Sequence, residues 1–244
     1  MQKVAERVFV VPLGYVNVVV LGEREKFSLV DAGIPGSLKR LEQQLNRAGF
    51  ELQNLQSVLI THAHPDHYGV LAELLNRKKV PVYAHPREIP VLLGQEKAAL
   101  PPRETLPLGQ QILQRIITSM KRPPTIPEAQ PIVEGQVLQD ILPGMTVIEL
   151  PGHAPGQVGF WIPSSRTLIA GDALMRGSGK CKLPLQALTV SMRDAARSAQ
   201  RIVDLDVERL IVGHGKPILE KAHQELHELE MPIQRQLALA GGSR

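Results

Sequence analysis

Short apolar runs typical of buried β-strands alternate with longer amphipathic stretches along the chain. These runs predict strands at residues 8–11, 16–21, 27–30, 57–60, 80–83, 146–150, 159–162, 167–170 and 209–212. The amphipathic stretches predict helices at residues 37–48, 69–78, 192–205 and 221–239. The tetrapeptide Ser-Met-Arg-Asp at 191–194 is typical of a capped helix start. Strands and helices are interspersed throughout, which favours an α/β or α+β architecture.

Residues 86–135 interrupt this pattern with proline-rich connections and one amphipathic helical stretch. The apolar positions 108, 112, 113, 116, 117 and 120 share one helical face. We interpret the segment as an insertion within a single domain, residues 1–231, and residues 232–244 as the end of a helix and a tail. The helix could pack on the core, cover an active site, form a dimer surface or lie on a membrane. Its polar face has few cations, which favours a cover or core packing.

Composition narrows the range of partners and compartments. The 244 residues are 43% hydrophobic and carry a formal net charge of +4, with Lys and Arg interspersed among Asp and Glu. No long basic block indicates nucleic-acid binding, and no stretch reaches the roughly 20 apolar residues of a membrane-spanning helix. The single cysteine, Cys181, excludes an internal disulfide. We therefore expect a cytoplasmic protein with a small-molecule ligand, no nucleic-acid partner and no stable membrane association; a homodimer is an open alternative.

Side chains of the type that bind metals follow four of the predicted strands. Three histidines and an aspartate lie within Thr61–Gly69, directly after one strand, and Asp172 follows another. Loops at the ends of neighbouring strands can bring such groups to one point. The predicted ligands are His62, His64, Asp66, His67, His153, Asp172 and His214.

The spacing of these residues predicts two adjacent metal ions. His62 and His64 alternate along an extended segment and can point together, and His153 completes a set of three nitrogen ligands. Asp66, His67 and His214 form a second set, and the two oxygens of Asp172 can bridge both ions. Imidazole and carboxylate ligands accommodate Zn, Fe or Mn, and we expect Zn.

The motif His62-Ala63-His64-Pro65-Asp66-His67 resembles the signature of the metallo-β-lactamase superfamily, and the later ligands occur in the family's order. The resemblance spans nearly the whole chain. It implies an α+β fold, a four-layer αββα sandwich of two mixed β-sheets flanked by helices, with the dinuclear site at one edge. Asp31 in Leu-Val-Asp-Ala-Gly looks like the family's first motif, a supporting acid outside the ligand set.

Two neighbouring cations would lower the pKa of a bridging water toward about 7 and polarise a carbonyl or phosphoryl oxygen. The predicted activity is therefore hydrolysis by a metal-bridging hydroxide, with Asp66 as general acid or base. An ester, thioester or lactone carbonyl is the expected substrate. The alternatives are a phosphodiesterase, a non-catalytic metal-binding member, and a mononuclear-iron enzyme similar to persulfide dioxygenases.

Candidate substrate contacts come from other superfamily branches. Lactonases similar to this chain carry a tyrosine three residues after the bridging aspartate, where Met175 stands here, and Tyr68 could replace it. Lys180 lies in a stretch that resembles glyoxalase II enzymes and could meet an anionic thioester. His85 follows a predicted strand and could support the ligands from outside or contact the cover.

Overall fold

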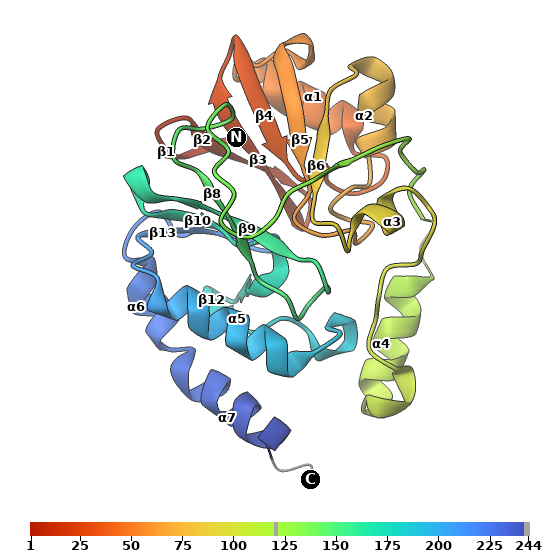
Figure 1. Ribbon diagram of the computed structural model, residues 1–244, viewed down its shortest axis with the longest axis vertical. Coiled ribbons are helices and arrows are strands. Elements are labelled where there is room, and N and C mark those ends of the chain that lie inside the picture. Colours follow the sequence, from red (N-terminus) through yellow and green to blue (C-terminus); the bar gives the residue numbers. More distant parts are fainter. Residues whose placement is uncertain (120–121, 242–244) are drawn as a thin grey trace.

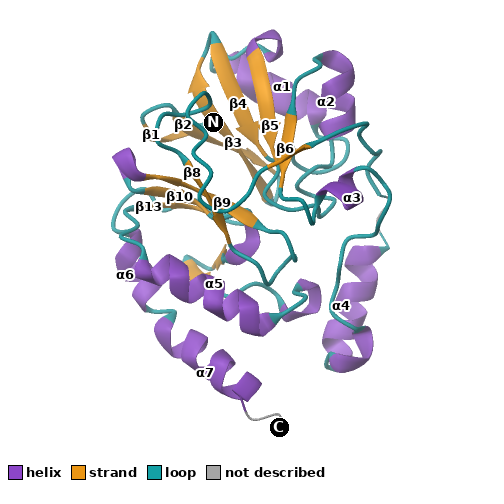
Figure 2. Cartoon of the chain, in the orientation of Figure 1, coloured by secondary structure: helices purple, strands orange, loops and turns teal. Residues whose placement is uncertain are grey.

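The computed structural model describes residues 1–119 and 122–241, and two β-sheets form its centre (Figures 1 and 2). The strands of the larger sheet are β1 (Gln2–Ala5), β2 (Val8–Leu13), β3 (Val16–Glu23), β4 (Lys26–Val30), β5 (Leu55–Leu59), β6 (Val82–Ala84) and β7 (Gln130–Pro131). They follow one another in sequence order across the sheet. Strands β1 to β4 pair antiparallel, whereas β4 to β7 pair parallel, so the sheet is mixed.

The smaller sheet comes from the second half of the chain. Its strands are β8 (Thr146–Glu149), β9 (Val158–Ile162), β10 (Thr167–Ile169) and β13 (Arg209–Ile211). The order is β13-β10-β9-β8, with β10 and β13 parallel and the other pairs antiparallel. A separate hairpin consists of β11 (Met175–Gly177) and β12 (Lys180–Lys182).

Helices cover the outer faces of both sheets (Figure 1). The α-helices are α1 (Leu38–Arg47), α2 (Leu71–Arg77), α3 (Ile89–Leu92), α4 (Leu108–Thr118), α5 (Met192–Asp204), α6 (Ala222–His227) and α7 (Glu230–Gly241). Short 3₁₀ turns are η1 (Leu52–Asn54), η2 (Arg103–Thr105), η3 (Pro163–Ser165), η4 (Gly171–Ala173) and η5 (Gln186–Leu188). Buried residues of α1 and α2 belong to the core of the larger sheet, and those of α5, α6 and α7 to the core of the smaller one.

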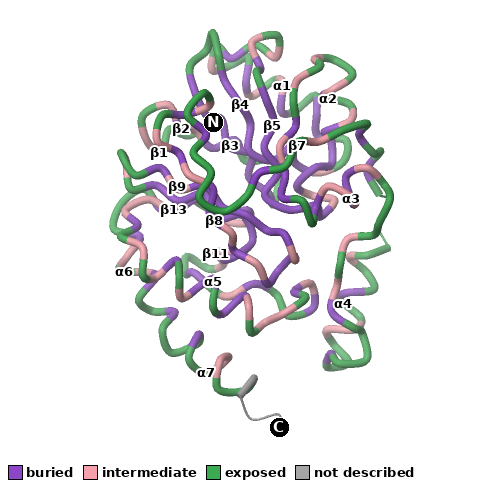
Figure 3. Tube along the Cα trace, viewed as in Figure 1, coloured by how far each residue is buried: buried purple, intermediate pink, exposed green. Residues whose placement is uncertain are grey.

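A third apolar cluster fills the space between the sheets, where Leu21 and Leu59 of the larger sheet meet Phe160 and Ile211 of the smaller one. Figure 3 shows the resulting distribution, with buried strands at the centre and exposed positions along the outer helices. The layers therefore run helix, sheet, sheet, helix. The predicted αββα sandwich with two mixed sheets is confirmed.

The strand pattern predicted from apolar runs agrees with the structure, and so does the start of α5, where the Ser191 hydroxyl accepts a hydrogen bond from the Asp194 amide at 3.2 Å. The single helix predicted for 221–239 is wrong, because the structure has two helices separated at residues 228–229. Pro232 has no N–H to donate to residue 228, so it fits only the first turn of a new helix. Helix α7 crosses the boundary expected at residues 231 and 232 and packs on α5 through Ile233, and the domain division stays a prediction.

Helix α4 packs against the rest of the protein with its polar face, whereas a core helix packs with its apolar face. Leu108, Ile112 and Ile116 are 72%, 54% and 63% exposed, and Leu113 is also exposed. Gln114 on the other face is buried and hydrogen-bonds with Pro101, Arg103 and Ala187. The apolar face is therefore largely exposed, with only Ile117 half-buried among its described positions, and amide hydrogen bonds attach the polar face instead. Met120 lies outside the described residues.

Within the described ranges, the structure contains no helix that is both long and apolar enough to cross a membrane.

Candidate metal centre

The predicted ligands meet at one edge of the sandwich, on loops that follow β5, β8, β10 and β13. The backbone carbonyl of Thr61, after β5, accepts a hydrogen bond from the Val158 amide at the start of β9, which joins the two sheets at this edge. Three overlapping groups of residues each place one ligand atom per residue within 4.8 Å of the others. Residues up to 152 positions apart in sequence, His62 and His214, thus contribute to one cluster.

The first ligand set consists of His62, His64 and His153. The Nδ1 atom of His64 lies 3.2 Å from Nε2 of His62 and 2.9 Å from Nε2 of His153. In His62 and His153 the other ring nitrogen, Nδ1, lies within hydrogen-bond distance of a hydroxyl. His62 Nδ1 is 3.1 Å from the Thr61 hydroxyl, and His153 Nδ1 is 3.2 Å from the Thr189 hydroxyl. These contacts orient the rings so that three nitrogens converge, as three imidazole ligands of one cation do.

The second ligand set consists of Asp66, His67 and His214. The His214 Nε2 atom lies 3.5 Å from an Asp66 oxygen. Asp172 lies between the two sets: one carboxylate oxygen is 3.0 Å from His214 Nε2 and 3.5 Å from His153 Nε2, and the other is 3.5 Å from His67 Nε2. Asp172 therefore contacts both sets, as the sequence predicts.

Three buried polar atoms of the candidate ligands have no hydrogen-bond partner: Nε2 of His64 and, 3.5 Å apart from each other, Nε2 of His67 and Oδ1 of Asp172. An unpaired buried polar atom costs free energy, about 1–3 kcal/mol for a neutral group and more for a charged one. A cation held by His67 and Asp172 would remove this cost at Nε2 of His67 and Oδ1 of Asp172. The residues present therefore fit divalent metal ions, and the nitrogen and oxygen donors match Zn, Fe and Mn.

Hydrogen bonds from outside the ligand sets hold several ligands in place. Asp31 is buried and accepts hydrogen bonds from the Thr61 amide at 2.8 Å and the Thr61 hydroxyl at 2.9 Å. Its other contact is Nδ1 of His67 at 2.8 Å, which directs His67 Nε2 toward Asp172. The Nδ1 atom of His214 donates to the Tyr15 carbonyl at 3.0 Å. Asp31 thus lies where the sequence places a supporting acid.

Burial governs the protonation of the first ligand set. It lowers the pKa of His62 and His64, and it lowers the pKa of His153, next to His64, to about 3. All three rings are therefore neutral at neutral pH. Neutral imidazole is the form that binds metals, because its unprotonated nitrogen carries a free lone pair.

The second ligand set has the opposite electrostatics. Burial favours the neutral forms, but the charges of Asp172 and Asp31 raise the pKa of His67 well above its usual value, and Asp172 raises that of His214. Burial raises the pKa of Asp172, but the nearby His67 and His214 lower it by a larger amount. The pKa of Asp172 is therefore well below its usual value. Asp172 is therefore anionic at neutral pH and favours protons on His67 and His214. A bound cation would take the place of those protons.

A family model for the metallo-beta-lactamase superfamily matches residues 11–214. The chain belongs to the metallo-β-lactamase superfamily. It is 30% identical to the probable metallo-hydrolase YflN of Bacillus subtilis (strain 168), over 82% of this chain and 79% of that protein. It is also 25% identical to the hydroxyacylglutathione hydrolase GloC of Haemophilus influenzae, over 79% of this chain and 82% of that protein.

Solved structures of this superfamily superpose on the chain. The metallo-beta-lactamase family protein TTHA1429 from Thermus thermophilus is 26% identical, with a TM-score of 0.70 over 97% of this chain and 82% of that one. TTHA1623, described in a di-iron-bound form, is 28% identical, with a TM-score of 0.64 over 87% of this chain and 95% of that one. The chain is therefore a metallo-hydrolase of this superfamily, with groups of histidines and aspartates that could hold metal ions.

The substrate contacts predicted from the sequence lie outside both ligand sets. Tyr68 is 5% exposed and belongs to the core of the larger sheet, so a substrate contact through its ring has no support from its placement. Met175 is half-buried on β11, and the Lys180 ammonium forms an exposed ion pair with Glu228 at 2.8 Å. His85 Nε2 lies 3.1 Å from Glu149, and its role as a support of the ligands or a contact of the cover stays a prediction. Contacts of Met175 and Lys180 with a substrate stay predictions.

Sequence reasoning missed four residues that contact the ligands or their loops: Thr189, Tyr15, Asn17 and Glu88. Each approaches from an element distant in sequence, so no local spacing marks it. Tyr15 is also 53% exposed, and its ring stacks on His214 with centroids 5.7 Å apart. An acidic residue beside a strand end, as Glu88 is, was the only signal available, and it is too common to single out.

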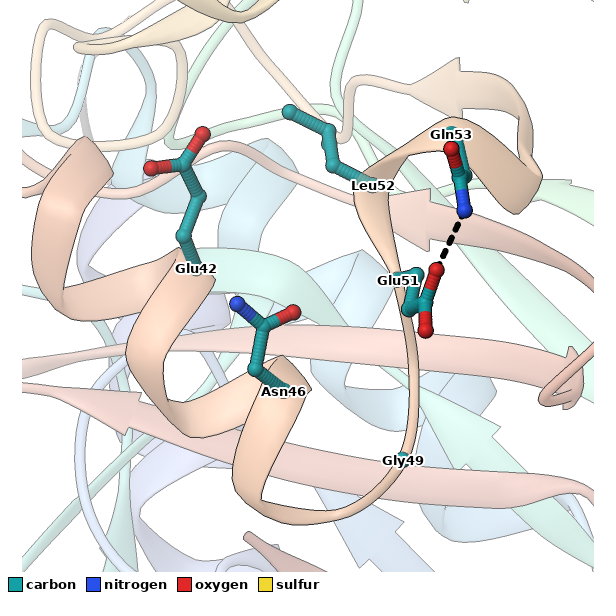
Figure 4. Close-up of a pocket in the computed structure, with 6 residues that line it drawn as sticks. All are labelled: Glu42, Asn46, Gly49, Glu51, Leu52 and Gln53. Atoms are coloured by element: carbon teal, nitrogen blue, oxygen red, sulfur yellow. Dashed lines mark hydrogen bonds between the residues drawn. The ribbon is translucent and has the colours of Figure 1, made fainter.

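A surface pocket lies apart from the metal centre, between α1 and η1 (Figure 4). Its lining residues are Glu42, Asn46, Gly49, Glu51, Leu52 and Gln53. The Gln53 amide donates to the Glu51 carboxylate across its rim. None of the metallo-β-lactamase ligands lines it.

Proposed function

We propose that the protein is a dinuclear metallo-hydrolase that cleaves an ester, thioester or lactone carbonyl of a small molecule. The observation that carries this proposal is the position of Asp172, whose two oxygens contact nitrogen atoms of both ligand sets while one of them has no hydrogen-bond partner. The di-iron form of TTHA1623 supports two ions, and the similarity to a hydroxyacylglutathione hydrolase supports a thioester substrate.

When bound, two divalent ions would supply an activated water at neutral pH and polarise the carbonyl of the substrate. The chain itself supplies the geometry and the proton transfer. Asp66 is half-buried, and one of its oxygens lies 3.5 Å from His214 Nε2, so the carboxylate borders the centre and keeps access to solvent. From this position Asp66 can accept a proton from the attacking water and deliver it to the leaving group.

Tyr15 is the aromatic side chain that we propose for substrate contact in place of Tyr68. Its ring is exposed and nearly parallel to the His214 ring, at an interplanar angle of 10°. Burial raises the pKa of its hydroxyl, and the Asp66 charge raises it further, so the phenol stays protonated and can donate a hydrogen bond. An exposed aromatic face beside the ligands would bind the acyl part of a substrate.

The insertion is connected to the first ligand set through η5 and is our candidate for a cover of the metal centre. Gln114 of α4 donates to the Ala187 carbonyl in η5 at 3.1 Å. Two residues later, the Thr189 hydroxyl contacts His153 of the first ligand set. Helix α4 is thus connected to the segment that orients a metal ligand, while its apolar face stays exposed.

The test is a substrate panel on protein reconstituted separately with Zn²⁺, Fe²⁺ and Mn²⁺. It contains a hydroxyacylglutathione thioester, a p-nitrophenyl ester, a lactone and a phosphodiester. The proposal predicts turnover of a carbonyl substrate that disappears when a chelator removes the metal. Turnover confined to the phosphodiester would replace the proposed reaction by a phosphodiesterase activity.

Asp66→Asn tests the proton-transfer role, with the exposed Asp140→Asn as the matched control. We expect Asp66→Asn to lower kcat by about 10²- to 10⁴-fold, the usual contribution of general acid–base catalysis. Because Asp66 also belongs to the second ligand set, metal content is measured in the same samples. Unchanged turnover of Asp66→Asn at full metal content would refute the role.

A further inference from the structure

Glu88 connects the two loops that carry the first ligand set. Its side chain is buried, and one carboxylate oxygen accepts a hydrogen bond from the Ala63 amide at 2.8 Å. The other oxygen accepts from the Gly156 amide, also at 2.8 Å. Ala63 stands between His62 and His64, and Gly156 follows His153 by three residues. A single carboxylate therefore joins a loop of the larger sheet to a loop of the smaller one.

The turn around Glu88 holds the Gly156 loop closely. A Cβ atom on Gly156 would lie 2.5 Å from the His85 ring and 2.9 Å from the Arg87 side chain, so no side chain fits at this position. The Arg87 guanidinium donates to the Pro155 carbonyl at 3.4 Å. These contacts fix the distance between the Gly156 loop and the turn around Glu88. Because the Glu88 carboxylate also binds the Ala63 amide, it fixes the position of Ala63 relative to the Gly156 loop.

We infer that Glu88 is a positioning residue for the first metal ion, because it sets the distance between His153 and the pair His62 and His64. Without the carboxylate, the Ala63 and Gly156 amides lose their acceptors and the two loops lose their shared contact. Hydrogen bonds behind the ligands commonly change metal affinity by about 10- to 100-fold. The inference rests on the metal centre of the proposed function and not on its substrate.

The His214 loop of the second ligand set has a different support. The Asn17 side-chain amide donates to the Val212 carbonyl at 2.8 Å and to the Gly215 carbonyl at 2.7 Å. Glu88 makes none of these contacts among the described residues. Loss of Glu88 should therefore weaken one ion selectively, and loss of Asn17 should weaken the other.

The experiment compares metal binding by apoprotein of the wild type, Glu88→Gln and Asn17→Ala. Gln keeps the size of Glu but replaces one acceptor oxygen by an NH₂ group, which would face a backbone N–H. Glu134→Gln is the matched control, since Glu134 pairs with Arg201 on the surface. Co²⁺ and Zn²⁺ affinities are measured by competition with a chelator, together with the visible spectrum of the Co²⁺ forms and the thermal midpoint.

Glu88→Gln is expected to weaken one of two ions by about 10- to 100-fold, to leave the other within about threefold, and to change the Co²⁺ bands of the weakened site. Asn17→Ala should weaken the other ion, and Glu134→Gln neither. If Glu88→Gln does not fold, Glu88→Asp replaces it, because its shorter side chain reaches only one loop. Equal weakening of both ions by Glu88→Gln, or wild-type binding of both, would overturn the inference; a wild type that binds no metal would instead refute the proposed function.

Discussion

Gly213→Ala probes the closest packing in the metal centre. A Cβ atom at Gly213 would lie 2.0 Å from Oδ1 of Asp172 and 2.8 Å from the His67 ring. Real Cβ contacts are not shorter than 3.0 Å, so the carboxylate must move by at least about 1 Å. Metal-to-ligand distances tolerate only about 0.2 Å, and a 1 Å misplacement costs about 100-fold in rate, or about 2.7 kcal/mol. We therefore expect kcat/KM to fall by at least this factor.

The assay combines metal analysis with turnover of the carbonyl substrate identified in the panel. Gly177→Ala is the matched control, because a Cβ atom at Gly177 meets no atom within 4 Å. Gly213→Ala should bind fewer than two ions per chain, whereas Gly177→Ala should match the wild type in metal content and rate. If Gly213→Ala retained both ions and a rate within twofold of the wild type, the placement of Asp172 between the ligand sets would be wrong.

Further changes test other parts of the structure. Burial raises the pKa of the Cys181 thiol to about 12, so a thiol reagent at pH 8 should modify it only after unfolding, and labelling of native protein would contradict its burial. Phe160→Ala, at a fully buried position between the sheets, should lower the free energy of unfolding by about 3–5 kcal/mol in urea titrations; a loss below 1 kcal/mol would contradict that packing. A homodimer stays a prediction. If the exposed apolar face of α4 forms its interface, light scattering should give the wild type a molar mass above the 26.8 kDa of the monomer, and Ile112→Glu should lower that mass. Equal molar masses of the wild type and Ile112→Glu would contradict an interface through α4.

The convergence of the candidate ligands could be predicted from sequence because each follows an apolar run and the ends of suitably paired strands share an edge. His62, His64 and Asp172 are examples: their positions depend on local chain direction and strand order, both of which the hydrophobic pattern reveals. The layers of the fold follow from the same pattern, since strands and helices each have one periodicity that buries an apolar face.

Contacts between distant elements could not be predicted in this way. Glu88 and Asn17 each support the ligand loops through two side-chain hydrogen bonds to backbone groups, which leave no periodic signal in the sequence. Helix α4 was predicted correctly as a helix, but its amphipathic pattern does not say which face packs inward, and the buried amide of Gln114 decides it. Pro232 is a local signal for the break between α6 and α7. The prediction missed it because the helical spacing of apolar residues continues across the break.

The dinuclear centre is tested by a titration of apoprotein with Zn²⁺ or Fe²⁺, in which bound metal per chain and hydrolysis of the carbonyl substrate are measured at each point. We expect saturation at two ions per chain, with turnover that rises as the centre fills and is abolished in Asp172→Asn. Turnover by the metal-free protein, or saturation at fewer than two ions per chain, would contradict the dinuclear centre.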